Sequence, residues 1–64
     1  MSDRAQRVLD ALMEYDANKK NKYPMTSIYG FFKGGWIERV GEDYDALTAD
    51  EEKKIIESFL EFAY

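Results

Sequence analysis

The sequence has no cysteine, no histidine and only one proline. Disulfides, thiolate nucleophiles, imidazole bases and the usual zinc sites are therefore excluded. Catalysis would need Asp, Glu, Lys or Tyr in a desolvated pocket, and a chain of 64 residues has little interior left for one. We therefore expect no enzymatic activity, no catalytic residue, no bound metal and no cofactor.

Long apolar runs are also absent. The longest stretch without a charged residue is residues 23–32, ten residues that include Pro24, whereas a helix that spans a membrane needs about 17 to 25. The first residues lead into a charged amphipathic segment rather than an apolar one. We therefore expect no signal peptide, no membrane association and a cytoplasmic location.

Positive charge is in the minority, because nine Lys and Arg stand against thirteen Asp and Glu, for a net charge of −4. The distribution is uneven. Residues 1–40 carry seven basic and five acidic side chains, whereas residues 41–64 carry two basic and eight acidic ones. A net negative protein is a poor general ligand for nucleic acid or for an anionic membrane.

Apolar residues make up 45% of the chain, which is enough for it to fold. Its length allows one domain, residues 1–64. In the first segment, apolar residues recur at spacings of three and four between Ala5 and Met13, after Ser2 or Asp3 as the N-cap. This pattern predicts a helix at about residues 3–18.

The last segment begins with a capping box, in which Thr48 precedes Glu51 by three residues. A wide apolar face follows it, made of Ile55, Ile56, Phe59, Leu60, Phe62 and Ala63. The pattern predicts a helix over residues 49–63.

The middle of the chain fits two structures. In the first, residues 28–33 and 36–40 are strands of a hairpin with a turn at residues 34–35. This pairing would set Phe31 opposite Glu38, so neither face would be cleanly apolar.

In the second, residues 26–33 are a helix capped by Thr26 and ended by Gly34 in a left-handed conformation, with a further turn at 36–40. We favour the helix. The predicted fold is thus an all-α bundle of three main helices, and an α+β fold with a central hairpin is the alternative.

The acidic run over residues 42–52 raises the question of a calcium site. The spacing does not fit an EF-hand loop. With Asp43 at the first position, Thr48 stands where the glycine of the sharp turn belongs and Lys54 where the bidentate carboxylate belongs. Helix capping and solvated surface charge explain the run better.

Ten aromatic residues are a large number for this length. We assign five of them to the core: Phe31, Phe32, Trp36, Phe59 and Phe62. A tyrosine hydroxyl needs water or a partner, so the tyrosines are expected at the core rim or on a contact surface. They are Tyr15, Tyr23, Tyr29, Tyr44 and Tyr64.

The function that we favour from the sequence is a non-enzymatic protein–protein interaction module, a small acidic regulator or inhibitor. Small stand-alone inhibitors, including those of viral or mobile-element origin, have this size, and spaced carboxylates are able to mimic nucleic-acid phosphates. The partner would be another protein, or a second copy in a homodimer. The candidate partner-binding residues are Glu42, Asp43, Tyr44, Asp45, Asp50, Glu51 and Tyr64.

The alternative is a weak nucleic-acid-binding module, in which cations hold the backbone and aromatic rings stack on bases. Its candidate residues are Lys19, Lys20, Lys22, Tyr23, Lys33, Trp36 and Arg39. So few cations would give a modest affinity that salt removes quickly, and the acidic half would repel the same ligand.

Overall fold

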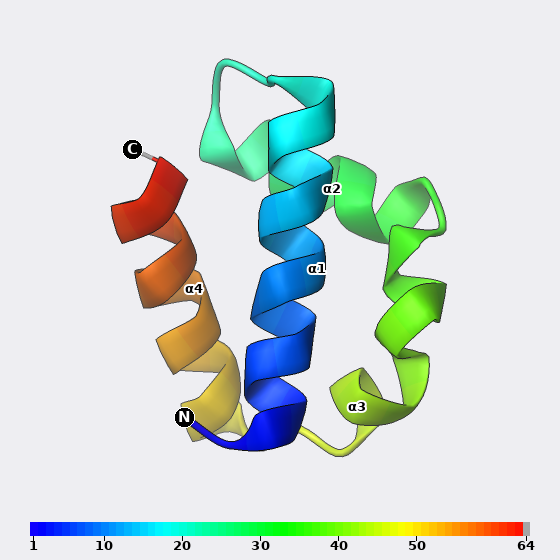
Figure 1. Ribbon diagram of the computed structural model, residues 1–64, viewed down its shortest axis with the longest axis vertical. Coiled ribbons are helices and arrows are strands. Elements are labelled where there is room, and N and C mark those ends of the chain that lie inside the picture. Colours follow the sequence, from blue (N-terminus) through cyan, green and yellow to red (C-terminus); the bar gives the residue numbers. More distant parts are fainter. Residues whose placement is uncertain (64) are drawn as a thin grey trace.

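The computed structural model describes residues 1–63, which form helices joined by short loops, with no strand among them (Figure 1). The elements are α1 (Asp3–Lys19), α2 (Pro24–Lys33), the 3₁₀ helix η1 (Trp36–Val40), α3 (Gly41–Asp45) and α4 (Ala49–Ala63). The predicted all-α fold is therefore confirmed, and the alternative hairpin is wrong. As a helix, residues 24–33 bury Phe31 against α1, an anchor that an isolated hairpin would lack.

Helix α1 lies at the centre of the fold, between α4 on one side and η1 with α3 on the other (Figure 1). Helices α1 and α4 begin at the same end of the molecule and run in the same direction. The chain therefore has to return between them, and α2, η1 and α3 make that return. The molecule measures 28 × 23 × 15 Å, so it is thin in one direction.

Both ends of α1 have local causes. The side chain of Ser2 accepts a hydrogen bond from the Ala5 amide, as expected of an N-cap, and Asp3 lies in the first turn. The helix ends one residue later than predicted, at Lys19. Lys20 then takes a left-handed conformation with φ of 53°, and its amide donates to the Asp16 carbonyl at 2.8 Å.

Two details of α2 differ from prediction. The helix begins at Pro24 and not at Thr26, because a proline at the first helical position has its φ already set and no amide to satisfy. The left-handed residue after the helix is Gly35, with φ of 88°, whereas Gly34 has φ of −79° in the right-handed region.

A polar cluster centred on Ser27 fixes the loop between α1 and α2, and the sequence pattern did not indicate it. Ser27 is fully buried. Its hydroxyl donates to Oδ1 of Asp16 at 2.5 Å and accepts from Nδ2 of Asn21 at 3.2 Å. Because the buried hydroxyl has both a hydrogen-bond donor and an acceptor as partners, these bonds replace the ones it would make with water, and it can hold the loop in place.

Helix α3 was not predicted, because five residues are too few for a periodic apolar stripe. Tertiary contacts hold it in place. Asp43 pairs with Arg7 of α1, and the Tyr44 ring lies against Phe32 of α2.

The core comes from three helices and consists of Ala5, Val8, Leu9, Ala11, Leu12, Tyr15, Phe31, Ile55 and Phe59. Helix α4 packs mainly against α1, so only one stripe of its wide apolar face is covered. Ile56, Leu60 and Phe62 remain 39%, 40% and 55% exposed. The prediction of Phe62 as a core residue is therefore wrong.

The prediction that phenylalanines lie in the core and tyrosines at its rim or on the surface is also wrong at two positions. Tyr15 is only 7% exposed, and its ring contacts Phe31 and Trp36 at centroid distances of 6.1 and 5.4 Å. Its hydroxyl fits because Gly30 has no side chain: a Cβ there would lie 2.1 Å from the oxygen. Phe32, predicted to be in the core, is 41% exposed.

Candidate functional site

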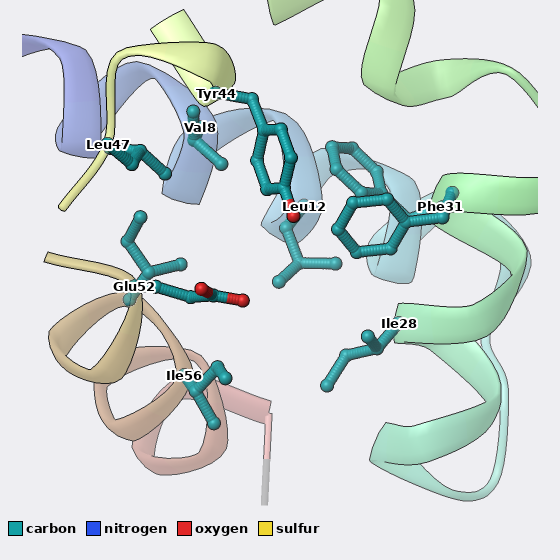
Figure 2. Close-up of a pocket in the computed structure, with 10 residues that line it drawn as sticks. Val8, Leu12, Ile28, Phe31, Tyr44, Leu47, Glu52 and Ile56 are labelled. Atoms are coloured by element: carbon teal, nitrogen blue, oxygen red, sulfur yellow. The ribbon is translucent and has the colours of Figure 1, made fainter. Parts of the chain in front are cut away.

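A small open pocket lies where α1, α2, α3 and α4 come together. Its volume is about 60 Å³. Ten residues line it (Figure 2): Val8, Leu12, Ile28, Phe31, Phe32, Tyr44, Leu47, Glu52, Ile55 and Ile56.

The helices direct side chains into the pocket, because residues one turn apart lie on the same helix face. Val8 and Leu12 are one turn apart on α1, so both side chains lie on the same face of that helix. Figure 2 shows Ile28 of α2 and Ile56 of α4 pointing into the space between these two helices from opposite sides. The Tyr44 ring lies 5.3 Å from the Phe32 ring, in an edge-on arrangement with an interplanar angle of 69°. The pocket is therefore assembled from parts of the chain that are distant in sequence.

The rim of the pocket is also apolar. Phe32 and Ile56 line it and are both exposed. Met25 and Leu60 are exposed as well and continue the same helical stripes, at seven residues before Phe32 and four after Ile56. Single exposed apolar residues are normal on a surface, whereas several beside a hollow make a candidate contact site.

Of the described residues that line the pocket, Glu52 is the one that carries a charge. Within residues 1–63 its side chain makes no hydrogen bond or ion pair. The adjacent Glu51 is the opposite case. Its carboxylate accepts from the Ser2 hydroxyl, from the Thr48 amide at 2.9 Å and from Nε of Arg4 at 3.2 Å.

These hydrogen bonds depress the pKa of Glu51 from 4.5 to about 2, and the bond from Ser2 has the largest effect. The predicted capping box is confirmed, because the Glu51 amide also donates to Oγ1 of Thr48 at 3.2 Å. Glu51 was a candidate partner-binding residue. The structure instead places it in a group of hydrogen bonds that joins the first turns of α1 and α4, which we call the clasp; its members are Ser2, Arg4, Thr48 and Glu51.

Asp43, another candidate, is also engaged inside the molecule. Nε and Nη2 of Arg7 donate to its two carboxylate oxygens at 2.8 and 2.7 Å. This two-point hydrogen bonding lowers the pKa of Asp43 and raises that of Arg7. Asp43 therefore holds α3 against α1.

The remaining acidic candidates point away from the fold. Glu42, Asp45 and Asp50 are exposed, and their side chains have no hydrogen bond or ion pair with any residue from 1 to 63. Tyr44 is half-buried, with its ring in the pocket lining. Tyr64 lies outside the described residues.

Three of the candidate nucleic-acid-binding residues are linked through Tyr15, which was not a candidate. Nζ of Lys19 lies 5.9 Å from the centre of the Tyr15 ring, and that ring contacts Trp36. The guanidinium carbon of Arg39 lies 4.0 Å from the centre of the Trp36 ring. Lys19, Tyr15, Trp36 and Arg39 thus form a series of two cation–π contacts joined by one edge-to-face ring contact, which we call the cation–aromatic stack.

The other basic candidates interact locally. Lys20 and Lys22 are exposed at the α1–α2 loop, and Nζ of Lys22 lies 5.4 Å from the centre of the Tyr23 ring. Lys33 donates to the Tyr29 hydroxyl at 2.9 Å. The structure therefore brings together only part of the predicted basic set.

Sequence reasoning missed most of the pocket. Of the ten described lining residues, Tyr44 alone was a predicted site residue. One signal was present, since the apolar face of residues 55–63 is wider than a single neighbouring helix covers. The pocket itself is not visible in the sequence, because its lining comes from four helices and the loop before α4.

No protein-family model, curated protein or solved structure matches the chain. In the part that the structure describes, no three carboxylates gather into a group that could hold a metal ion. No helix between residues 1 and 63 is both long and apolar enough to cross a bilayer. The function is therefore inferred from the described surface.

Proposed function

We propose that this protein is a non-enzymatic protein-binding module that uses the apolar pocket and its rim as the contact surface. The observation that carries the proposal is the exposure of Phe32 and Ile56 on either side of a pocket that has a free carboxylate, Glu52, in its lining. The centre of a protein interface is apolar and closely packed, with polar groups around it. This surface has such an apolar centre, with the Glu52 carboxylate in its lining.

The acidic residues support the same function. Glu42, Asp45 and Asp50 need no partner within the described fold, so they are free to attract a basic protein. Exposed charge of one sign speeds association with a partner of the opposite sign and makes the rate sensitive to salt. We infer a small cytoplasmic regulator or inhibitor that acts by covering a surface of its partner.

A nucleic-acid-binding module is the second candidate, and the cation–aromatic stack is the observation in its favour. Stacking on a base requires a free aromatic face. Arg39 already covers one face of Trp36. A base would have to displace it, so this function ranks below protein binding.

Affinity capture from the host organism separates the two functions. The baits are the wild-type chain, Ile56→Gln at the pocket rim and Lys20→Gln at the basic loop, and both substitutions are at exposed positions. Loss of a captured protein with Ile56→Gln alone supports the pocket as the contact surface. Capture that is unchanged by Ile56→Gln contradicts it.

Binding to mixed-sequence DNA and RNA at near-physiological salt is measured in parallel. Protein binding predicts no retention of nucleic acid by the wild-type chain. Retention that Lys20→Gln or Arg39→Ala abolishes would replace the proposal with the second candidate.

A further inference from the structure

We propose that the pocket receives one aliphatic side chain from an amphipathic helix of a partner protein, and that a lysine or arginine about one turn away on that helix pairs with Glu52. This inference rests on the proposed function and names the class of partner that the same surface binds.

The volume of the pocket determines the size of the inserted group. A cavity that encloses a benzene molecule measures about 150 Å³, whereas this pocket measures about 60 Å³. The pocket is therefore too small to enclose a ring-sized ligand completely. A branched aliphatic side chain such as leucine partly fills the space while the rest of its residue stays outside.

The residues around the pocket indicate that the partner segment is a helix. Ile28 and Phe32 lie one turn apart on α2, and Ile56 and Leu60 lie one turn apart on α4. Helical spacing makes each pair an apolar ridge, and Ile28 and Ile56 lie on opposite sides of the pocket (Figure 2). A helix with apolar residues at spacings of three and four presents one side chain to the pocket and its neighbours to the ridges.

The negative charge in the pocket lining indicates that the partner helix carries a lysine or arginine. Among residues 1–63, Glu52 is the only charged residue that lines the pocket, and no lysine or arginine of this range lines it. The two arginines of α1 are already engaged, Arg4 with Glu51 and Arg7 with Asp43. A docked apolar helix would remove part of the water around the exposed Glu52 carboxylate, and a cation from the partner would offset this cost.

The test uses the full chain labelled with ¹⁵N and three alanine-based helical peptides as probes. The first peptide has leucines one turn apart and a lysine one turn further on. The second has glutamate in place of lysine, and the third has serines in place of the leucines. Amide shifts are followed during each titration.

We expect saturable shifts for the first peptide at the residues around the pocket, including Leu12, Ile28 and Ile56. Glu52→Gln should weaken its binding by about two- to five-fold, the usual range for one exposed ion pair, and added salt should reduce this difference. Glu57→Gln is the matched control, because Glu57 is exposed on the same helix and does not line the pocket. It should leave the affinity unchanged.

Three results would overturn the inference. The first is the absence of saturable amide shifts at the pocket. The second is equal affinity for the lysine and glutamate peptides. The third is amide shifts at the pocket that change with protein concentration in the absence of peptide, because the occupant would then be a second copy of the chain. If the peptides fail while capture still depends on Ile56, the proposed function stands and this occupant is wrong. If both fail, the proposed function fails too.

Discussion

The hydroxyl of Ser2 donates a hydrogen bond to the carboxylate of Glu51, 49 residues further along the chain. Ser2 is the N-cap of α1, and Glu51 completes the capping box of α4 with Thr48. One carboxylate therefore joins the first turns of two helices that run in the same direction. The clasp sets the alignment of α4 on α1, and with it the position of Glu52 and Ile56 at the pocket.

The clasp predicts a loss of stability in acid. The folded pKa of Glu51, about 2, lies below its ordinary value of 4.5, so the folded state binds fewer protons than the unfolded chain between these values. This contribution is complete above about pH 5 and disappears as the pH falls toward 2. The melting temperature of the wild-type chain should fall over this window, and Glu51→Gln should reduce that fall.

The pKa of Asp43 is also lowered, so some acid dependence should remain in the Glu51→Gln variant. Ser2→Ala provides a direct check, because the Ser2 hydroxyl is the largest cause of the Glu51 shift. The pKa of the Glu51 side chain, followed by NMR, should rise in this variant. An unchanged pKa would contradict the assigned role of Ser2.

Thr48→Ala should destabilise the fold through loss of the α4 cap. The expected decrease in the free energy of unfolding is about 1 kcal/mol, which corresponds to about 4 to 8 °C in Tm for a domain near this size. Thr26→Ala is the matched control, because the Thr26 side chain is exposed and makes no hydrogen bond with any described residue. Equal effects in thermal denaturation would contradict the capping assignment.

Gly30→Ala should destabilise the fold by about 1 to 3 kcal/mol, the usual range for overpacking. The added Cβ would lie 2.1 Å from the Tyr15 hydroxyl oxygen. Gly41→Ala should be neutral or stabilising, because Gly41 has helical φ and open space around it. Tyr15→Phe removes the hydroxyl and should recover part of the loss caused by Gly30→Ala, and a chemical denaturation cycle measures this coupling.

Asp43→Asn should lower the melting temperature, whereas Asp45→Asn should not. Asp43 makes two hydrogen bonds with Arg7, while Asp45 is exposed on the same short helix without a described partner. The difference should shrink at high salt, because the Arg7–Asp43 pair is at the surface. Hydrogen exchange of the α3 amides should speed up in Asp43→Asn alone.

Local signals in the chain were sufficient for most of the helix positions. The capping box at Thr48 and Glu51 marked the start of α4, and apolar spacing gave its full range, 49–63. The turn at residues 36–40 was also predicted at its observed bounds. These features involve contacts within a few residues, so the local sequence is enough to specify them.

Burial depended on the partners of each helix. Tyr15 is buried because α2 and η1 cover its ring, whereas Phe62 is exposed because α4 packs mainly against one helix. The roles of the carboxylates were decided in the same way. Glu51 has the Ser2 hydroxyl and the Arg4 guanidinium within reach, and Glu52, one residue later, faces the pocket.

The amino-acid order by itself thus determined that the chain forms helices, where most of them begin and end, and that one end of the sequence is acidic. Only the tertiary structure decided which carboxylates stay free and where an apolar hollow opens. Hydrogen bonds within a turn depend on neighbouring residues. A pocket and an ion pair between helices depend on segments that meet only after the chain has folded.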